Sequence, residues 1–450
     1  MKGDMTKGNP MSLIIKFFIP MFIGNLFQQL YNVVDSVVVG RFVGNEAFAA
    51  VGSCFLIMSF ISSILIGLSI GVGTLFSQLF GAKEYDQLKK TISTSFIFIM
   101  AISLILSIFT VIFLDEILIL FKLPVEILPY AKDYLLYIFI GLFFTGLYNI
   151  CAYLLRSIGD SKSPLYFLMI SSVINIVLDL LFVIKFNMAT MGVGLATLIA
   201  QAVAGIFALV YTVKKMEFLE FRRKDLVFDR SCFKEVLNYS VLTAIQQSIS
   251  SFGMMLVQGL VNTFGTMTIA AFAACSKVDE FANRPLQDLS NAFSTYTAQN
   301  KGAKDDERIK EGFKDVVKLI GIISIIITSL AFIFAPDLIA IFVKRESVEI
   351  IDIGVRYLRF VSIFYVLLGF IVMFYGFFRG LGEIKLSVIL TIMSQAVRVL
   401  LAYGLASVGF GFSSIGIAVV VGWSISDVLG VFLYKKVMNK NEELLGEKAK

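Results

Sequence analysis

The sequence of 450 residues contains no histidine and few charged residues. Without an imidazole group, the chain cannot form a Ser-His-Asp triad or a zinc site with histidine ligands. Charged residues make up 16% of the chain, whereas a typical soluble domain has about 25%. Hydrophobic residues make up 58%, and the mean hydropathy is +0.85. Most of the chain is therefore expected to face something other than water.

Three further absences narrow the possible functions. No Gly-x-x-x-x-Gly-Lys-[Ser/Thr] segment occurs, so nothing indicates an ATP-driven pump. Cys54, Cys151, Cys232 and Cys275 are far apart in the sequence, which excludes a C-x-x-C motif and predicts free thiols within apolar helices. No A-x-A-like cleavage site ends the first apolar run, so no removable signal peptide is expected.

Long apolar runs take up most of the chain. A membrane-spanning helix needs about 20 mostly apolar residues. The segment 91–114 has no charged residue and is bounded by Lys89-Lys90 and Asp115-Glu116. The same criterion predicts an all-α membrane protein with twelve transmembrane helices. These cover residues 13–39, 47–76, 91–114, 133–155, 164–186, 191–213, 235–263, 267–297, 316–335, 353–378, 386–408 and 413–434.

The basic residues lie mainly on one side of these spans. If the N-terminus is inside, the inner loops and tails hold most of the 39 Lys and Arg residues. Because loops rich in Lys and Arg face the cytoplasm, we expect both termini to be cytoplasmic in a multi-pass protein of the cytoplasmic membrane. The net charge of +6 then reflects this membrane bias, and no nucleic-acid partner is expected.

The two halves of the chain carry similar motifs in the same order, which predicts two pseudo-symmetric six-helix lobes around a central cavity. Six spans in each half make the repeat parallel, and such halves typically enclose a site near the middle of the bilayer. The clearest matches pair Gln78, Gly81, Ala82 and Lys83 with Gln299, Gly302, Ala303 and Lys304, and Arg156, Gly159 and Lys162 with Arg379, Gly382 and Lys385. The predicted parts are an N-lobe (1–213), a cytoplasmic linker (214–234), a C-lobe (235–436) and a cytoplasmic tail (437–450).

Two carboxylates, Asp35 and Asp179, lie deep within predicted spans of the N-lobe, where a charge is costly and calls for a reason. Asn175 precedes Asp179 by four residues and shares its helix face. Oxygen ligands of this kind can bind a hard cation such as Na⁺, and a desolvated carboxyl can instead carry a proton near neutral pH. Gln28 and Tyr31 precede Asp35 by seven and four residues and share its helix face, Asn149 lies in the fourth span, and Thr197 lies in the sixth. For Asn149 or Thr197 alone, a polar contact between helices is the simpler interpretation.

In the C-lobe, five charged residues gather in the predicted span 267–297: Lys277, Asp279, Glu280, Arg284 and Asp288. Either they neutralise one another in pairs such as Lys277 with Glu280 and Glu280 with Arg284, or some of them bind substrate. Arg398 can neutralise either Asp279 or Asp427 across helices, and the sequence does not choose between them.

Pro20 lies inside the first span. Proline kinks a helix, and within a membrane such a kink is tolerated. We hypothesise that Pro20 is a hinge and that the first helix changes its bend when Asp35 changes protonation. Farther along the chain, Gly81 is interpreted as a helix C-cap and Lys83 as an anchor at the inner face.

These segments together resemble the multidrug and toxic compound extrusion (MATE) family, bacterial type. The resemblance runs through IPMFIGNLFQQLYNVVDSVVVGRFVGNEAFAAVG, through the paired loops QLFGAKEYDQLKK and TAQNKGAKDDERIK, and through YNICAYLLRSIGDSKSPL, FFRGLGEIKLS and NIVLDLLFV. It covers residues 13–436 and rests on the order and spacing of several motifs.

The resemblance implies a twelve-helix antiporter that exports organic cations and drugs in exchange for H⁺ or Na⁺. It also implies an ion-coupling site made of Asp35, Asn149, Asn175, Asp179 and Thr197, and it matches Pro20 to the family's first-span proline. The residues expected to line the substrate cavity are Gln28, Tyr31, Gln246, Lys277, Asp279 and Glu280. Gln246 and Gln247 stand in the seventh span, where some members have a carboxylate, so a second ion site of that type is not expected.

The favoured interpretation is a secondary active multidrug efflux antiporter that works by alternating access. Its expected partners are the lipid bilayer and small organic cationic or amphipathic drugs, it needs no cofactor beyond the coupling ion, and it is expected to be a monomer. The alternative is a flippase for a lipid-linked or anionic precursor, which would favour extra spans and a cavity rich in Lys or Arg. An intramembrane enzyme is not expected, because the chain has no His and no D-D-x-x-D motif.

Overall fold

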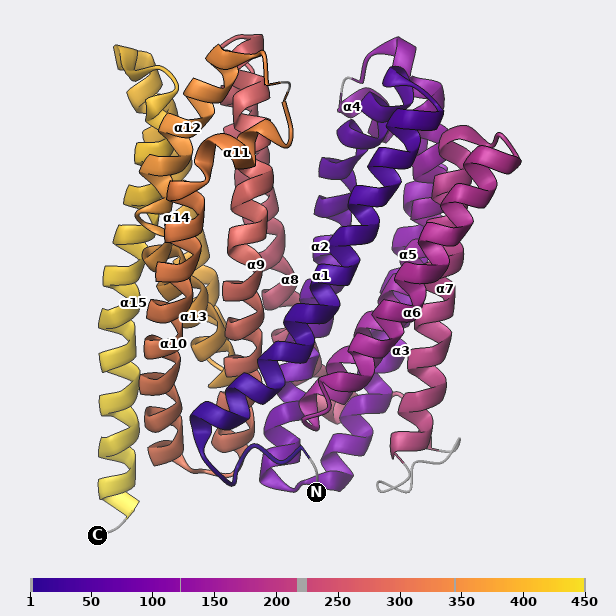
Figure 1. Ribbon diagram of the computed structural model, residues 1–450. Coiled ribbons are helices and arrows are strands. Elements are labelled where there is room, and N and C mark those ends of the chain that lie inside the picture. The colour runs from indigo at the N-terminus through magenta and orange to yellow at the C-terminus, as the bar shows by residue number, and fades with distance from the viewer. Residues whose placement is uncertain (1–2, 122, 217–224, 344, 449–450) are drawn as a thin grey trace. The chain divides into compact units, whose positions relative to one another are not determined.

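The computed structural model describes residues 3–121, 123–216, 225–343 and 345–448 (Figure 1). Part of the predicted linker, together with Lys122 and Lys344 of the outer loops, lies outside the described residues. The helices of the first half are α1 (Pro10–Phe42), α2 (Asn45–Ala82), α3 (Tyr85–Ile112), α4 (Leu114–Leu120), the 3-10 turn η1 (Val125–Ile127), α5 (Leu128–Ser157), α6 (Lys162–Leu180), the π-turn η2 (Leu181–Lys185) and α7 (Ala189–Lys215).

The second half repeats this order of elements, with the bent pair of helices α12 and α13 in the place of η1 and α5. Its helices are α8 (Arg230–Val261), α9 (Thr266–Gly302), α10 (Asp306–Ile333), α11 (Ala335–Ala340), α12 (Val348–Ser362), α13 (Tyr365–Gly380), α14 (Ile384–Leu405), the π-turn η5 (Ala406–Phe410) and α15 (Ser413–Lys448).

Each of the twelve predicted spans corresponds to one long helix or to one bent pair of helices. Within the described residues, ten helices are long and apolar enough to cross a membrane, and α12 with α13, bent by 55°, passes the same test as a pair. The twelfth is α9, which has 37 residues but carries the charged segment around Asp279. The twelve-helix fold predicted from the apolar runs is confirmed.

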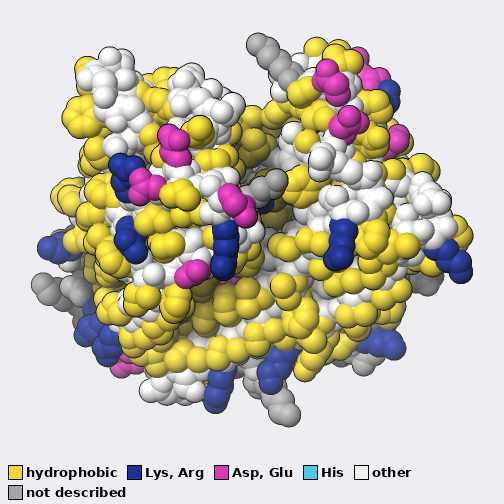
Figure 2. Space-filling model, turned by 45° about the horizontal axis from the view of Figure 1, so that its top comes forward, with side chains coloured by type: hydrophobic (Ala, Val, Ile, Leu, Met, Phe, Trp, Pro, Cys, Tyr) yellow, Lys and Arg dark blue, Asp and Glu magenta, His cyan; other side chains and the backbone are white. Residues whose placement is uncertain are grey.

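The outward-facing surfaces of these helices are apolar. Leu400 and Val428 are each 73% exposed, and many other large apolar side chains are also exposed. The space-filling view shows broad apolar areas with few charged side chains among them (Figure 2). Such surfaces are stable only against an apolar solvent, which is the lipid of a bilayer.

The contacts between helices group the chain into two units. Unit 1 consists of Met1–Ser248 and Ala298–Asp305, and unit 2 consists of Ile249–Thr297 and Asp306–Lys450. Unit 1 therefore contains α1 to α7 together with the first part of α8 and the last turns of α9. The lobe boundaries predicted from the sequence stay a prediction.

Each unit is built around its own packed helices. In unit 1, α5 packs against α7, α2 and α3, and α1 packs against α6. Its buried core includes the large side chains of Phe76 and Phe139. In unit 2, α14 packs against α15, and α13 packs against both of them and against α10.

The sequence repeat is also a repeat of backbone conformation. Lys83 directly after α2 and Lys304 two residues after α9 both take up a left-handed conformation, with φ of 60° and 59°. Gly159 and Gly382 likewise have φ of 82° and 86°. The prediction that Gly81 caps α2 is wrong, because Lys83 is the C-cap residue and Gly81 is still helical.

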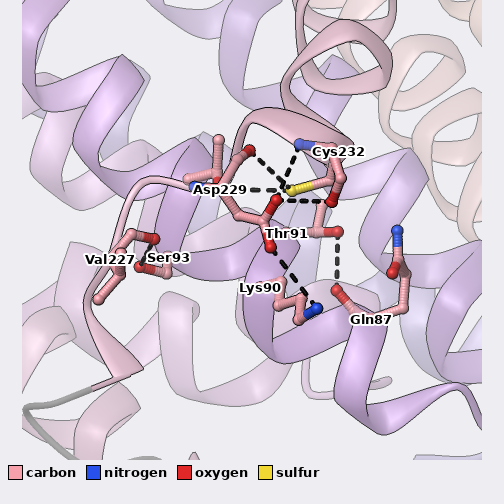
Figure 3. A network of polar contacts seen from close by, with 9 residues as sticks. Gln87, Lys90, Thr91, Ser93, Val227, Asp229 and Cys232 are labelled. Atoms are coloured by element: carbon pink, nitrogen blue, oxygen red, sulfur yellow. Dashed lines mark hydrogen bonds and ion pairs between the residues drawn. The ribbon is translucent and has the colours of Figure 1, made fainter.

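The segment before α8 is fixed to α3 by polar contacts (Figure 3). The Ser93 hydroxyl donates to the Val227 carbonyl at 2.9 Å, and Lys90 lies 3.6 Å from the Asp229 carboxylate. Asp229 also accepts hydrogen bonds from the N–H and hydroxyl of Ser231 at 2.8 and 2.6 Å. These bonds from Ser231 hold the pKa of Asp229 below its ordinary value, so this carboxylate starts α8 as a charged N-cap.

Candidate functional site

The two carboxylates singled out in the N-half come together inside unit 1. Asp35 lies on α1 and Asp179 lies on α6, and these two helices pack against each other. Asp35 is 2% exposed, and Asp179 is completely buried. Asp179 is two residues before the π-turn η2, a local widening of the helix that is frequent at functional sites.

The Asp35 and Asp179 side chains interact directly with each other. Two ionised carboxylates can only accept hydrogen bonds, so a bond between them requires one shared proton. Among the described residues, no donor reaches Oδ1 of Asp35 or either oxygen of Asp179. A shared proton or a bound cation would compensate this pair, whereas the two charges alone would repel each other.

Asn175 and Thr197 add further oxygens to the same place. The amide Nδ2 of Asn175 donates to the Thr197 hydroxyl at 3.4 Å, which leaves Oδ1 of Asn175 buried without a donor. The Thr197 hydroxyl lies 2.9 Å from the Val193 carbonyl and also interacts with Asp35. Because this hydroxyl has a single proton, it can satisfy only one of these two acceptors at a time.

The site therefore contains more acceptor oxygens than donors. We define the acceptor cluster as Asp35, Asn175, Asp179 and Thr197. Buried polar groups are normally hydrogen-bonded, and a surplus of acceptors alone is the arrangement that a proton or a hard cation completes. In unit 1 the structure thus brings together four of the five predicted ion-coupling residues.

Asn149, the fifth predicted residue, does not join this cluster. It is half-buried on α5, and no hydrogen bond found in the described residues connects it with Asp35 or Asp179. The two other predicted N-half residues do lie beside the cluster. The Tyr31 side chain interacts with Gln28 and electrostatically with Asp35 and Asp179. Gln28, Tyr31 and Asp35 therefore share one face of α1.

Tyr134 is a neighbour of the cluster that the sequence analysis missed. It lies on α5, is 4% exposed and interacts electrostatically with both Asp35 and Asp179. Its backbone is also close to α7, because a Cβ atom on Gly194 would lie 2.8 Å from the Tyr134 carbonyl oxygen. The sequence has 16 tyrosines, and nothing in the spacing of this one distinguishes it from the others.

The predicted C-half residues are divided between the two units. Gln246 is 1% exposed and belongs to unit 1, whereas Lys277, Asp279 and Glu280 belong to unit 2. The Tyr365 hydroxyl donates to the Asp279 carboxylate, and Lys277 is exposed.

Two charge interactions predicted for the C-half involve Glu280 and Arg398. Glu280 pairs with Arg284 at 2.8 Å, as one of the predicted pairs requires. The sequence left open whether Arg398 neutralises Asp279 or Asp427. In the structure its guanidinium interacts electrostatically with Asp279. Asp427 has no such partner among the described residues.

Pro20 is buried within α1, which is helical from Pro10 to Phe42. The structure therefore places the proline on the same helix as Asp35, about four turns away along the axis. Whether this residue acts as a hinge stays a prediction.

A set of glycines on α2 forms a second feature that the sequence analysis missed. A Cβ atom on Gly67 would lie 2.5 Å from the Cα of Ala244, and one on Gly71 would lie 2.2 Å from the Tyr239 carbonyl oxygen. The spacing of these two glycines is the G-x-x-x-G pattern that lets membrane helices approach closely. Their absence of side chains is what allows α2 to contact the first part of α8.

The repeated Gly81 and Gly302 contact each other's helices reciprocally. A Cβ atom on Gly81 would lie 1.9 Å from the Gln299 carbonyl oxygen, and one on Gly302 would lie 1.9 Å from the Gln78 carbonyl oxygen. We call these two contacts the glycine crossing of α2 and α9. All four residues belong to unit 1.

The N-terminal segment is bound at the same place. The Met5 N–H donates to Oε1 of Gln299 at 2.8 Å, and Nε2 of Gln299 donates to the Ser157 carbonyl at 2.7 Å. Gln299 thus joins the N-terminal segment, the end of α5 and the glycine crossing.

Comparison with known proteins gives consistent similarities. The MatE family model matches residues 20–181 and 243–404. The chain is 26% identical over 447 residues to the probable multidrug resistance protein YpnP of Bacillus subtilis (strain 168), with 99% of both proteins covered.

Two solved structures share the fold over nearly their whole length. An outward-facing multidrug resistance MATE family transporter of the MOP superfamily is 24% identical, with a TM-score of 0.91 and coverage of 98% of this chain and 99% of that one. A MOP superfamily transporter from Pyrococcus furiosus Vc1 (DSM3638) is also 24% identical, with a TM-score of 0.92 and the same coverage. For the second protein, a reversed polarity of the binding pocket is said to suggest a different function, so this fold alone does not identify a substrate.

Proposed function

Because this chain belongs to the MatE family and is a multi-pass membrane transporter of the multidrug efflux type rather than an enzyme, we propose that it is an antiporter. In this proposal it exports small organic cationic or amphipathic drugs in exchange for H⁺ or Na⁺. The bias of Lys and Arg toward the inner loops supports a cytoplasmic-membrane location with both termini inside. It is proposed to act as a monomer.

The observation that carries the proposal is the surplus of acceptor oxygens in the acceptor cluster. Oδ1 of Asp35, Oδ1 of Asn175 and both oxygens of Asp179 are buried without a donor among the described residues. A cation entering the cluster neutralises charge in a medium of low dielectric constant, where the effect on conformation is large. Its departure restores negative charge, which attracts a cationic drug, so ion and drug bind in alternation.

Proton and Na⁺ coupling are distinguished by imposing one gradient at a time. The purified protein is reconstituted in liposomes, and uptake or efflux of a fluorescent organic cation is followed under a pH gradient without Na⁺ and under a Na⁺ gradient at equal pH. We expect drug movement that depends on one of these gradients and stops when an ionophore dissipates it. If neither gradient moves the cation, the antiport proposal is wrong and the flippase alternative is favoured.

Pro20→Ala tests the proposed hinge in the same liposomes. Alanine restores the backbone N–H that proline lacks, so it allows the missing hydrogen bond to form and favours a straight α1. We expect slower drug transport with unchanged drug binding, because a hinge acts on the conformational step. If Pro20→Ala transports at the same rate as the unsubstituted protein, Pro20 is a static feature of α1.

A further inference from the structure

A buried carboxylate in unit 2 has no role in the acceptor cluster. Asp427 lies on α15 and is 8% exposed, and both of its carboxyl oxygens are buried. Among the described residues, no hydrogen-bond donor reaches either oxygen. An ionised carboxylate without a partner is unfavourable in such surroundings, so Asp427 requires a proton or a cation.

Arg398, which the sequence offered as a partner for Asp427, does not neutralise it. Arg398 on α14 interacts instead with Asp279 and Tyr357, and its NH2 group lies 3.7 Å from the sulfur of Met254.

The basic side chains of α12, which also packs against α15, are engaged elsewhere. Arg356 pairs with Asp352, and Arg359 lies over the ring of Phe332.

Hydroxyl side chains lie on α13 and α14, two of the helices that pack against α15. Tyr375 on α13 interacts electrostatically with Asp427, and its hydroxyl interacts with the side chains of Thr391 and Ser394 on α14. Thr391 and Ser394 are buried, with exposed fractions of 0% and 3%. Carboxylate and hydroxyl oxygens are suitable ligands for a small hard cation, and a carboxyl beside hydroxyls can equally hold a proton.

We propose that Asp427, with Tyr375, Thr391 and Ser394, forms a second monovalent-cation site, which takes H⁺ or Na⁺ and lies within unit 2. The site is not a copy of the acceptor cluster. Gly194 corresponds to Gly416 in the repeat, and the same separation places Gly205 on α7 opposite Asp427. The first half therefore has no carboxylate at this position, and the site does not depend on the coupling role proposed for Asp35 and Asp179.

The chain contains its own reporter for this site. Trp423 is the only tryptophan, and it precedes Asp427 by four residues on the same face of α15. It packs with Tyr375 against the cluster of Leu286, Ile371 and Val372. The fluorescence of the full-length protein in detergent is therefore expected to respond when a cation binds to Asp427.

The experiment titrates this fluorescence in two arms, with Na⁺ against choline at constant pH and with pH in the absence of Na⁺. Infrared difference spectra follow the carboxyl groups in parallel. We expect a saturable signal in one arm, which Asp427→Asn abolishes. Tyr375→Phe, which removes one oxygen and keeps the ring, is expected to weaken the apparent affinity by about tenfold.

Asp179→Asn is the matched control, because it makes the same chemical change in unit 1. It is expected to leave the Trp423 signal intact while it stops transport, so this site and the proposed coupling site can fail independently. If the fluorescence and the carboxyl bands of Asp427→Asn match those of the unsubstituted protein in both arms, Asp427 binds no cation and the proposal is wrong.

Discussion

Asp35→Asn is expected to abolish drug transport without unfolding the protein. The asparagine has the same shape, but it cannot share a proton with Asp179 or compensate a bound cation. A one-for-one exchange of monovalent cations moves no net charge, so a tenfold ion gradient, worth about 1.4 kcal/mol, can sustain a drug gradient of about tenfold. Without the carboxylate this gradient is expected to fall to the level of liposomes that contain no protein.

The measurement is accumulation of a fluorescent organic cation in liposomes at equal protein content, together with resistance in a drug-sensitive host. Asp86→Asn is a suitable control, because Asp86 is exposed in the first turn of α3 and its charge does not contact the acceptor cluster. The thermal stability of Asp35→Asn is expected to be preserved or raised, since one of two facing carboxylates is removed. Resistance equal to that of the unsubstituted protein at equal expression would show that Asp35 is not the coupling residue.

Lipid physics explains why the sequence predicts so much of this fold. The segment 91–114 has no charged residue because α3 has to face a solvent that cannot hydrogen-bond to it. The same penalty makes Asp35 and Asp179 visible in the sequence, because a carboxylate within an apolar run needs a reason to be there. Helical spacing then correctly places Asn175 beside Asp179.

The features of the site that the sequence did not predict depend on contacts between helices that are distant in the sequence. Tyr134 lies on α5 and approaches the acceptor cluster only because α5 packs against α7 and α2. Arg398 had two acceptable partners at the level of charge, and the packing of unit 2 selects Asp279. Asn149 was grouped with the cluster through resemblance, and its own helix face does not bring it into hydrogen-bond contact with the carboxylates in the described residues.

The roles of the α2 glycines show the same limit most clearly. Gly81 was interpreted as a cap from its position near the end of an apolar run. The structure shows instead that it is helical and that the space for its missing side chain is occupied by the backbone at Gln299. A close approach between two helices leaves no local signal in either sequence segment except the glycine itself.

Gly81→Ala is expected to be the most destabilising single-methyl change in α2 among the substitutions considered. The added Cβ atom would lie 1.9 Å from the Gln299 carbonyl oxygen, far inside van der Waals contact, and the opposing group is backbone that cannot rotate away. Overpacking of this kind costs about 1–3 kcal/mol. Gly52→Ala is the control in the same helix, because nothing lies within 4 Å of its Cβ position, and alanine there should stabilise the helix by up to about 1 kcal/mol.

Gly81→Ala is expected to lower the stability and Gly52→Ala to raise it. This difference distinguishes the close contact at the glycine crossing from the general preference of helices for alanine. Thermal unfolding in detergent measures both variants, and transport in liposomes shows whether the crossing of α2 and α9 is needed in the transport cycle. Gly302→Ala should resemble Gly81→Ala, since its Cβ position is equally close to the Gln78 carbonyl oxygen. The double variant should cost less than the sum, because opening one contact of the pair also relieves the other. If Gly81→Ala is as stable as Gly52→Ala, the two helices do not approach this closely, and the reciprocal contact cannot be the reason for glycine at both positions of the repeat.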